Sequence, residues 1–251
     1  VSGNDVIVRQ APPSERVEAF DEDACDTIID RWHQPGWQNS LTRADGSKVG
    51  LWYTCASDLA ITYLDIFVYF DMNIGGTPRA FIDAEIAKAN EIFQRSGVHI
   101  RLNLVGYELI DLPVERGFST LSQMRQSLSQ FSNLDAVRQN SGADLIYTFA
   151  TEDDRRKLCG VAYLGGYKGR WDYSDGLGLS ACHGGETFAH EVAHNLGSDH
   201  DEAHAGDGYH FWFSRGFNVL DQNDIDYVST VMSYGTAEVG MFSSPNLSCK
   251  G

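Results

Sequence analysis

The chain has 251 residues, of which 42% are hydrophobic and 22% charged, so its composition excludes disordered and fibrous proteins. Its 19 Lys and Arg against 35 Asp and Glu give a net charge of −16, which disfavours binding to nucleic acid or to anionic membranes. No stretch approaches the roughly 20 apolar residues of a membrane-spanning helix. We expect a folded protein without a nucleic-acid or membrane partner, whose acidity serves solubility.

Residues 1–59 differ in pattern from the rest. They carry turn signals at Pro35-Gly36 and Asp45-Gly46 and a weak apolar pattern, and they predict one short helix near 21–32. We interpret 1–59 as an N-terminal extension or propeptide-like segment and 60–251 as the main domain. Because the chain begins with Val1 and not Met, we expect a removed leader and an exported, extracellular protein.

From residue 61 onward the pattern alternates between strands and helices. Thr77 and Pro78 are typical of a helix start, and Gly97 of a helix end. The predicted strands are 61–71, 98–105, 143–149 and 176–180, and the predicted helices are 78–96 and about 119–138. This order predicts an α/β fold with a twisted, mostly parallel sheet and packed helices. The glycine-containing strand 176–180 is expected at the edge of that sheet.

The strongest functional signal is a run of histidines. His190 and His194 are four residues apart, so on a helix they share one face and can bind one zinc ion. Glu191 lies beside the first ligand and can reach a water on the metal. Gly197 can adopt a left-handed conformation that ends the helix and brings His200 to the same metal. Three imidazoles leave the fourth zinc position open, as in catalytic sites.

A second motif follows at residues 230–235. There the Thr-Val-Met-Ser-Tyr-Gly sequence around Met232 resembles the methionine turn that lies beneath the zinc in metzincins. With the long zinc motif, it makes residues 60–251 resemble a metzincin catalytic domain. Asp201, after the third histidine, is similar to the residue of the adamalysin or reprolysin branch. The segments 159–165 and 242–246 resemble bacterial reprolysin-like proteases.

The resemblance implies an α/β (α+β) fold with a twisted mixed sheet, an antiparallel edge strand, and packed helices that include the zinc-binding helix. It also implies that Met232 supports the histidines without binding metal. Tyr234 is similar to the tyrosine of astacins and serralysins that stabilises the oxyanion, while animal adamalysins generally lack it. Tyr234 is either such a residue or a packed aromatic. Asp201 either orients a neighbouring group or is a surface acid.

These features predict a secreted zinc endopeptidase acting on protein or peptide substrates. Glu191 would be the general base and acid, and the edge strand would bind extended substrate. Two alternatives remain: a non-proteolytic zinc amide hydrolase, and a degenerate zinc-binding module. Calcium is a second, weaker cofactor candidate, because acidic residues cluster in 172–175 and 199–207.

The five cysteines allow two disulfides and a free thiol in an exported chain, and the sequence does not decide their pairing. We favour Cys159–Cys182, which would pin the rim of the substrate site. Cys25, Cys55 and Cys249 would then tether the N-terminal segment or leave one thiol spare.

Latency is a further hypothesis for residues 1–59. Cys25 or one of Asp21, Asp23 and Asp26 would occupy the open zinc position and inhibit the enzyme intramolecularly. The alternative is an ordinary N-terminal extension.

Overall fold

In the computed structural model, the chain is described at residues 7–8, 40–42, 48–50, 61–112, 118–127, 131, 133–151, 158–166, 173–205, 214–220, 226–235 and 239–243. Its contacts form two compact units, one of residues 1–11 and 63–251 and the other of Pro12–Thr62. The division of the chain at residue 59 stays a prediction. The helix predicted near 21–32 lies outside the described residues.

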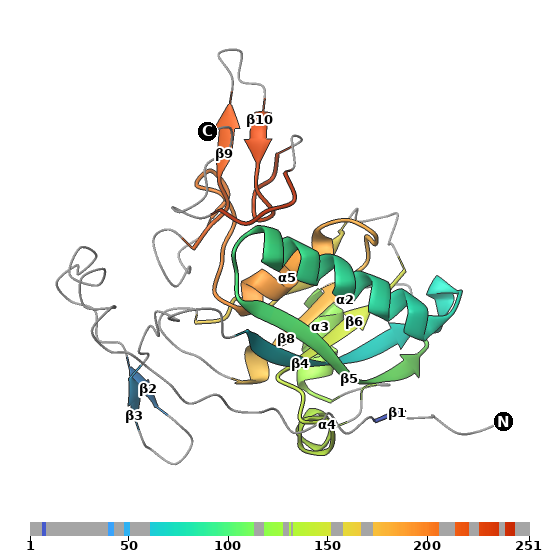
Figure 1. Cartoon of the computed structure of the whole chain (residues 1–251). Coiled ribbons are helices and arrows are strands. Elements are labelled where there is room, and N and C mark those ends of the chain that lie inside the picture. Colours follow the sequence, from blue (N-terminus) through green and yellow to red (C-terminus); the bar gives the residue numbers. More distant parts are fainter. Residues whose placement is uncertain are drawn as a thin grey trace. The chain divides into compact units, whose positions relative to one another are not determined.

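The first unit contains a six-stranded sheet, which Figure 1 shows behind two helices. Its order is β1 (Ile7–Val8), β5 (Ile100–Ile110), β4 (Thr62–Asp71), β6 (Leu145–Phe149), β8 (Leu177–Ser180), β7 (Gly160–Ala162). Strands β4, β6 and β8 run parallel, whereas β7 is antiparallel to β8, and β1 is antiparallel to β5. The predicted mixed α/β sheet with an antiparallel edge strand is therefore confirmed.

Helices cover both faces of this sheet. Alternate residues of β4 point to opposite faces, as in any strand. Ile66, Val68 and Phe70 join one buried cluster with helices α2 (Pro78–Arg95) and α5 (Thr187–Asn195). Phe67 and Tyr69 join a second cluster with residues of α3 (Phe118–Arg125) and α4 (Leu134–Ser141). The burial of both β4 faces explains its nearly continuous apolar sequence.

Three local predictions need correction. The stretch 119–138 forms two short helices instead of one, because the Asn133 side chain accepts a hydrogen bond from Ala136 N–H and starts α4 anew. Thr77 precedes α2, but its side chain makes no capping hydrogen bond. Residues 176–180 contain β8, which lies inside the sheet between β6 and β7 and is not the edge.

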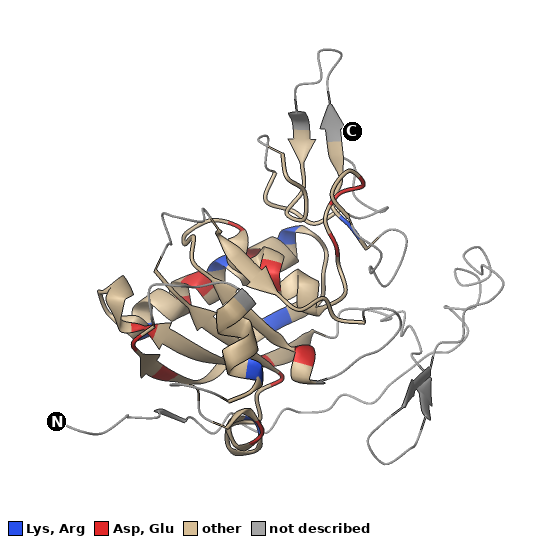
Figure 2. Cartoon of the chain, turned by 180° about the vertical axis from the view of Figure 1, so that it is seen from behind, with Lys and Arg blue, Asp and Glu red and all other residues tan. Residues whose placement is uncertain are grey.

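The remaining elements are smaller. The 3-10 helices Met72–Ile74 and Tyr173–Asp175 connect parts of the main unit, and β9 (Asn218–Leu220) pairs with β10 (Asp226–Ser229). In the second unit, β2 (Ser40–Thr42) pairs antiparallel with β3 (Lys48–Gly50), and the predicted Asp45-Gly46 turn lies outside the described residues. No helix among the described residues is long and apolar enough to cross a membrane. Figure 2 shows acidic residues on several elements of the described chain.

Candidate metal centre and active site

Helix α5 carries two of the three histidines. It forms at Thr187–Asn195 because Phe188, Ala189 and Val192 bury one face in the core beside α2. It ends where Gly197 adopts φ 88° and donates its N–H to the His194 carbonyl at 2.9 Å. This stop redirects the chain so that His200 returns to His190 and His194.

The three histidines converge. One ring nitrogen from each lies within 4.8 Å of the others, and the Nε2 atoms of His194 and His200 are 3.1 Å apart. His190 Nδ1 lies 2.7 Å from the Val231 carbonyl oxygen, and His194 Nδ1 lies 2.9 Å from that of Ser198. A carbonyl only accepts, so each Nδ1 carries the proton and each Nε2 keeps its lone pair for a metal.

Burial keeps these rings neutral. It lowers the pKa of His190 to about 4, and burial together with the neighbouring imidazoles lowers that of His194 to about 3. The pKa of His200 is also lowered, again mainly by burial. Neutral imidazole is the form that binds a metal ion.

The third histidine is held by the loop around it. The backbone N–H of His200 donates to Asp199 Oδ1 at 2.8 Å, and Asp199 itself pairs with Ser214 and Gly216 through the backbone. A Cβ on Gly216 would lie 2.4 Å from the Met232 carbonyl oxygen, so only glycine permits this approach. The loop of the third histidine and the methionine turn therefore pack backbone to backbone.

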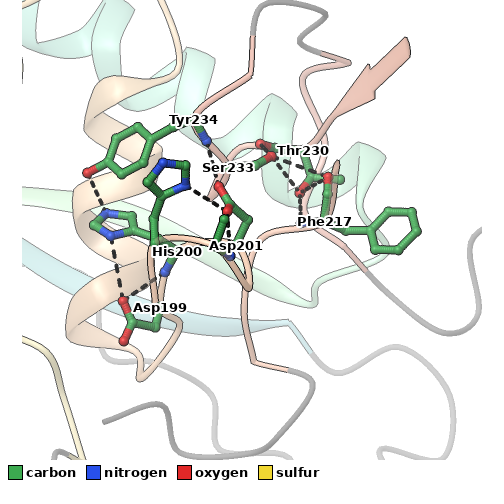
Figure 3. A network of polar contacts seen from close by, with 9 residues as sticks. Asp199, His200, Asp201, Phe217, Thr230, Ser233 and Tyr234 are labelled. Atoms are coloured by element: carbon green, nitrogen blue, oxygen red, sulfur yellow. Dashed lines mark hydrogen bonds and ion pairs between the residues drawn. The ribbon is translucent and has the colours of Figure 1, made fainter. Parts of the chain in front are cut away.

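Met232 is buried in the same cluster as Phe188, Ala189 and Val192 of the zinc-binding helix. The hydroxyls of Thr230 and Ser233 bond to the backbone of Phe217 and close the turn (Figure 3). These contacts place Met232 among the residues that support α5, where its predicted supporting role requires it.

Asp201 and Tyr234 also meet at this turn (Figure 3). The buried Asp201 carboxylate accepts hydrogen bonds from the Tyr234 N–H at 3.0 Å, the Ala203 N–H at 3.1 Å and His204 Nδ1 at 2.7 Å. Burial alone would raise the pKa of Asp201, but these bonds and the His204 charge lower it overall. Asp201 is thus no surface acid, since it fixes the backbone that carries Tyr234.

The Tyr234 side chain is 59% exposed, and its hydroxyl lies 2.9 Å from His200 Nε2. The same nitrogen lies 3.1 Å from Nε2 of His194, within the group of imidazoles that could hold a metal. The phenol is therefore positioned beside the metal centre and is not a packed core aromatic.

Glu191 is buried on α5, and its Oε2 has no hydrogen-bond partner within the described part of the protein. Burial raises the pKa of this carboxyl to about 8. A buried carboxylate on the helix that carries His190 and His194 fits a site for a cation and a water molecule, because both compensate the cost of burial.

These observations match zinc better than calcium. Three imidazoles suit zinc, whereas calcium requires six to eight oxygen ligands. Within the described ranges, the histidine trio is the group whose geometry could hold a metal. Asp175 pairs with Arg125 at 3.0 Å, and the carboxylates of Asp199 and Asp201 accept backbone hydrogen bonds. The calcium candidate therefore has no support here.

Two further features anchor the site. The predicted Cys159–Cys182 disulfide is confirmed, and it joins the start of β7 to the loop before α5. Cys25, Cys55 and Cys249 lie outside the described residues, as do Asp21, Asp23 and Asp26.

The second anchor, Asn195, was missed by sequence reasoning. Its buried Nδ2 donates to the carbonyls of Tyr163 at 2.8 Å, Asp175 at 2.9 Å and Leu177 at 3.1 Å. Its Oδ1 accepts from the Tyr147 hydroxyl at 2.7 Å. A lone Asn within the zinc motif gave no signal of these long-range contacts.

The burial of Glu191 generates a pH prediction for metal-free protein. With a folded pKa near 8 against 4.5 for an ordinary glutamate, the unfolded state releases its proton first, so stability falls between pH 4.5 and 8. Glu191→Gln should remove this loss and stabilise chelator-treated protein by about 3 kcal/mol at pH 7, with little difference at pH 4. Denaturant unfolding measures this.

The matched control is Glu91→Gln on the exposed face of α2, which should change the unfolding free energy by less than about 0.5 kcal/mol. Equal pH dependence of Glu191→Gln and the unchanged protein would contradict the burial of Glu191.

Comparison with known proteins supports this assignment. Residues 80–201 match the metallopeptidase family M12B, reprolysin-like. A peptidyl-Asp metalloendopeptidase of Pseudomonas aeruginosa is 29% identical over 80% of this chain and 37% of its own length. One of Stenotrophomonas maltophilia is 24% identical over 70% of this chain and 43% of its own length. The chain thus spans well under half of these curated relatives.

Among solved structures, a chain of a chaperone–substrate complex shares the fold. It superposes with a TM-score of 0.56 at 19% identity, over 83% of this chain and 32% of that chain. The family match includes His190, His194 and His200, and the family implies zinc. The predicted resemblance is confirmed: residues 80–201 are similar to reprolysin-like metallopeptidases.

Proposed function

We propose that the protein is a secreted zinc-dependent endopeptidase that hydrolyses internal peptide bonds at the His190, His194 and His200 centre. The observation that carries this proposal is the convergence of three neutral imidazoles, two of them on the helix that also carries Glu191, whose buried Oε2 has no hydrogen-bond partner among the described residues. When bound, zinc would supply a Lewis acid for the scissile carbonyl and lower the pKa of a water molecule.

In the proposed reaction, Glu191 acts as general base and then as general acid. Its carboxylate takes a proton from the attacking water as the water oxygen bonds to the carbonyl carbon. The carboxylic acid then gives that proton to the departing amine as the C–N bond breaks. Desolvation favours both steps, because a carboxyl group with a raised pKa transfers protons readily near neutral pH.

The substrate would bind to strand β7, not to β8 as its sequence suggested. Ala181 N–H donates to Cys159 O at 2.7 Å and Tyr163 N–H donates to Leu177 O at 3.2 Å, so residues 159 and 163 face β8. In an antiparallel strand, the N–H and C=O of one residue point to the same side, and those of the next residue point to the opposite side. Gly160 and Ala162 therefore face the open edge, where an extended peptide can add as a further strand.

Tyr234 is proposed to stabilise the oxyanion that forms on the scissile carbonyl. Its exposed hydroxyl lies beside Nε2 of His200, and Asp201 fixes its backbone N–H. A phenol at this position can donate to developing negative charge without a large movement.

The curated relatives are named peptidyl-Asp metalloendopeptidases. We therefore propose that the substrates of this chain carry Asp next to the cleaved bond. The chain offers a cation for such a side chain. Arg95, the last residue of α2, donates to the Val239 carbonyl at 3.2 Å, and its Nη1 would lie 3.2 Å from a Cβ on Gly240. The segment around Gly240 pairs with residues 229–231, whose Val231 carbonyl holds His190. Arg95 thus lies beside residues 239–241, which we propose as one wall of the pocket for the substrate residue next to the cleaved bond.

This proposed wall also has an apolar part. The Phe242 ring stacks on Phe93 of α2 with centroids 5.4 Å apart, so it belongs to the core cluster beside the wall. The wall therefore combines an apolar base with the Arg95 cation and with the Glu186 carboxylate, whose Oε1 would lie 3.1 Å from the same Cβ on Gly240.

Secretion and latency remain part of the proposal. The Cys159–Cys182 disulfide supports an oxidising compartment. Inhibition by residues 1–59 is tested by measuring activity before and after their proteolytic removal, because a latent enzyme gains activity on trimming. Activity that does not rise contradicts latency.

Glu191→Ala tests the proposed reaction. The variant should bind one zinc ion as the unchanged protein does, because no histidine is altered, and should cleave casein about 100- to 10,000-fold more slowly. Zinc content and casein digestion, with and without a chelator, measure both. Full activity would exclude the mechanism, and zinc binding without casein cleavage in the unchanged protein would favour the amide hydrolase or the binding module.

Tyr234→Phe tests the oxyanion role. Loss of one preorganised donor should lower kcat roughly 100-fold while KM and zinc content stay close to their original values. Since Tyr234 is exposed, stability should change little. An unchanged kcat would rule out this role.

A pair of peptides that differ only by Asp or Asn beside the scissile bond tests the acidic preference. The unchanged enzyme should cleave the Asp peptide faster, and Arg95→Gln should reduce this ratio about tenfold, because a charge-assisted hydrogen bond contributes roughly 1.5–3 kcal/mol. Lys88→Gln, the same charge change on α2, is the control and should keep the ratio. Equal cleavage of both peptides by the unchanged enzyme would contradict the preference.

A further inference from the structure

Strand β7 and helix α5 approach each other very closely at one point. A Cβ built on Gly160 would lie 2.3 Å from Glu191 Oε1, 2.7 Å from its Cγ and 2.8 Å from its Cδ. Each of these distances is shorter than any van der Waals contact between such atoms. The buried Glu191 carboxylate therefore lies directly on the backbone of Gly160.

The helix cannot move away to make room. Asn195, at the end of α5, donates to the carbonyls of Tyr163 and Leu177, which belong to the strand region on either side. The His194 carbonyl accepts a hydrogen bond from Gly165 N–H at 2.8 Å. These bonds hold α5 at a fixed distance from β7, so a side chain at residue 160 would displace the carboxylate and not the helix.

Gly178 on the neighbouring strand β8 is approached just as closely by a side chain. A Cβ on Gly178, which pairs with Ala162, would lie 2.3 Å from Cε1 of Tyr147. That ring reaches Asn195 through its hydroxyl. Gly160 on β7 and Gly178 on β8 thus lack a side chain at the points where Glu191 and Tyr147 approach the two strands.

We propose that Gly160 is a positioning residue for Glu191: its bare backbone sets the location of the carboxylate relative to the substrate-binding edge. The Gly160 N–H and C=O also face the open edge of the sheet. Gly160 would therefore bind the substrate backbone and at the same time contact Glu191, the proposed base. The inference rests on the proposed function, since it assigns Glu191 as the base.

A double-mutant cycle on metal-free protein tests the contact independently of proteolysis. Gly160→Ala should lower Tm by several degrees when residue 191 is Glu, and should cost almost nothing in a Glu191→Ala background, where no carboxylate remains to be displaced. Gly185→Ala is the control, because a Cβ there meets no atom within 4 Å. An equal loss of Tm in both backgrounds would overturn the proposal.

Kinetics of the zinc-loaded enzyme test the positioning role. Gly160→Ala should reduce kcat about 100-fold, as expected for a reacting group misplaced by about 1 Å, with unchanged zinc stoichiometry. Adding Gly160→Ala to Glu191→Asp, whose shorter side chain leaves room for the methyl group, should cause little further loss. An unchanged kcat in Gly160→Ala, or loss of zinc from it, would overturn the proposal.

The two experiments separate the possible failures. If the unchanged protein has no peptidase activity, the proposed function fails, and the Tm cycle still decides whether Gly160 positions Glu191.

Discussion

The hydrogen bonds of the Asn195 carboxamide fix helix α5 against the β7–β8 edge of the sheet, and the geometry of the site depends on this contact. All four bonds are to groups on β6, β8 or the segments next to them. A buried amide with its donors and acceptor satisfied adds stability, whereas an unsatisfied one would cost about 1–3 kcal/mol. The network therefore selects one position of α5, and with it the positions of His190, His194 and Glu191.

The third ligand depends on a different set of contacts. His200 belongs to a loop whose backbone lies against the methionine turn, where Gly216 approaches Met232 too closely for any side chain. The carbonyl oxygen of Val231, in the same turn, accepts a hydrogen bond from His190 Nδ1. One turn thus orients a ligand on the helix and supports the loop that supplies the third ligand. This arrangement explains how residues 190 and 231, far apart in sequence, form one centre.

Local patterns made much of the site predictable. His190 and His194 are one helical turn apart, and Gly197 supplies the left-handed residue that ends the helix, so these positions follow from helix geometry. The long strand β4 was predictable because both of its faces are buried. The methionine turn followed from its spacing and family resemblance.

Features that depend on long-range contacts were not predictable. Strand β7 has three residues, too few for a periodic pattern, so its place at the edge was assigned wrongly to residues 176–180. The break between α3 and α4 depends on an Asn133 cap within a polar stretch. The functions of Gly160 and Asn195 come from contacts between different elements that are 18 to 48 residues apart in sequence, and neither residue type signals them.

We expect the Nε2 atoms of His190, His194 and His200 to bind one zinc ion near Glu191. The most direct measurement is anomalous diffraction at the zinc absorption edge from crystals of the zinc-loaded protein. We expect one strong peak about 2.0–2.1 Å from Nε2 of each of the three histidines, with Nδ1 of His190 and His194 still hydrogen-bonded to their carbonyl oxygens. A zinc peak at bonding distance from other residues, or from the Nδ1 atoms of the histidines, would contradict this zinc site.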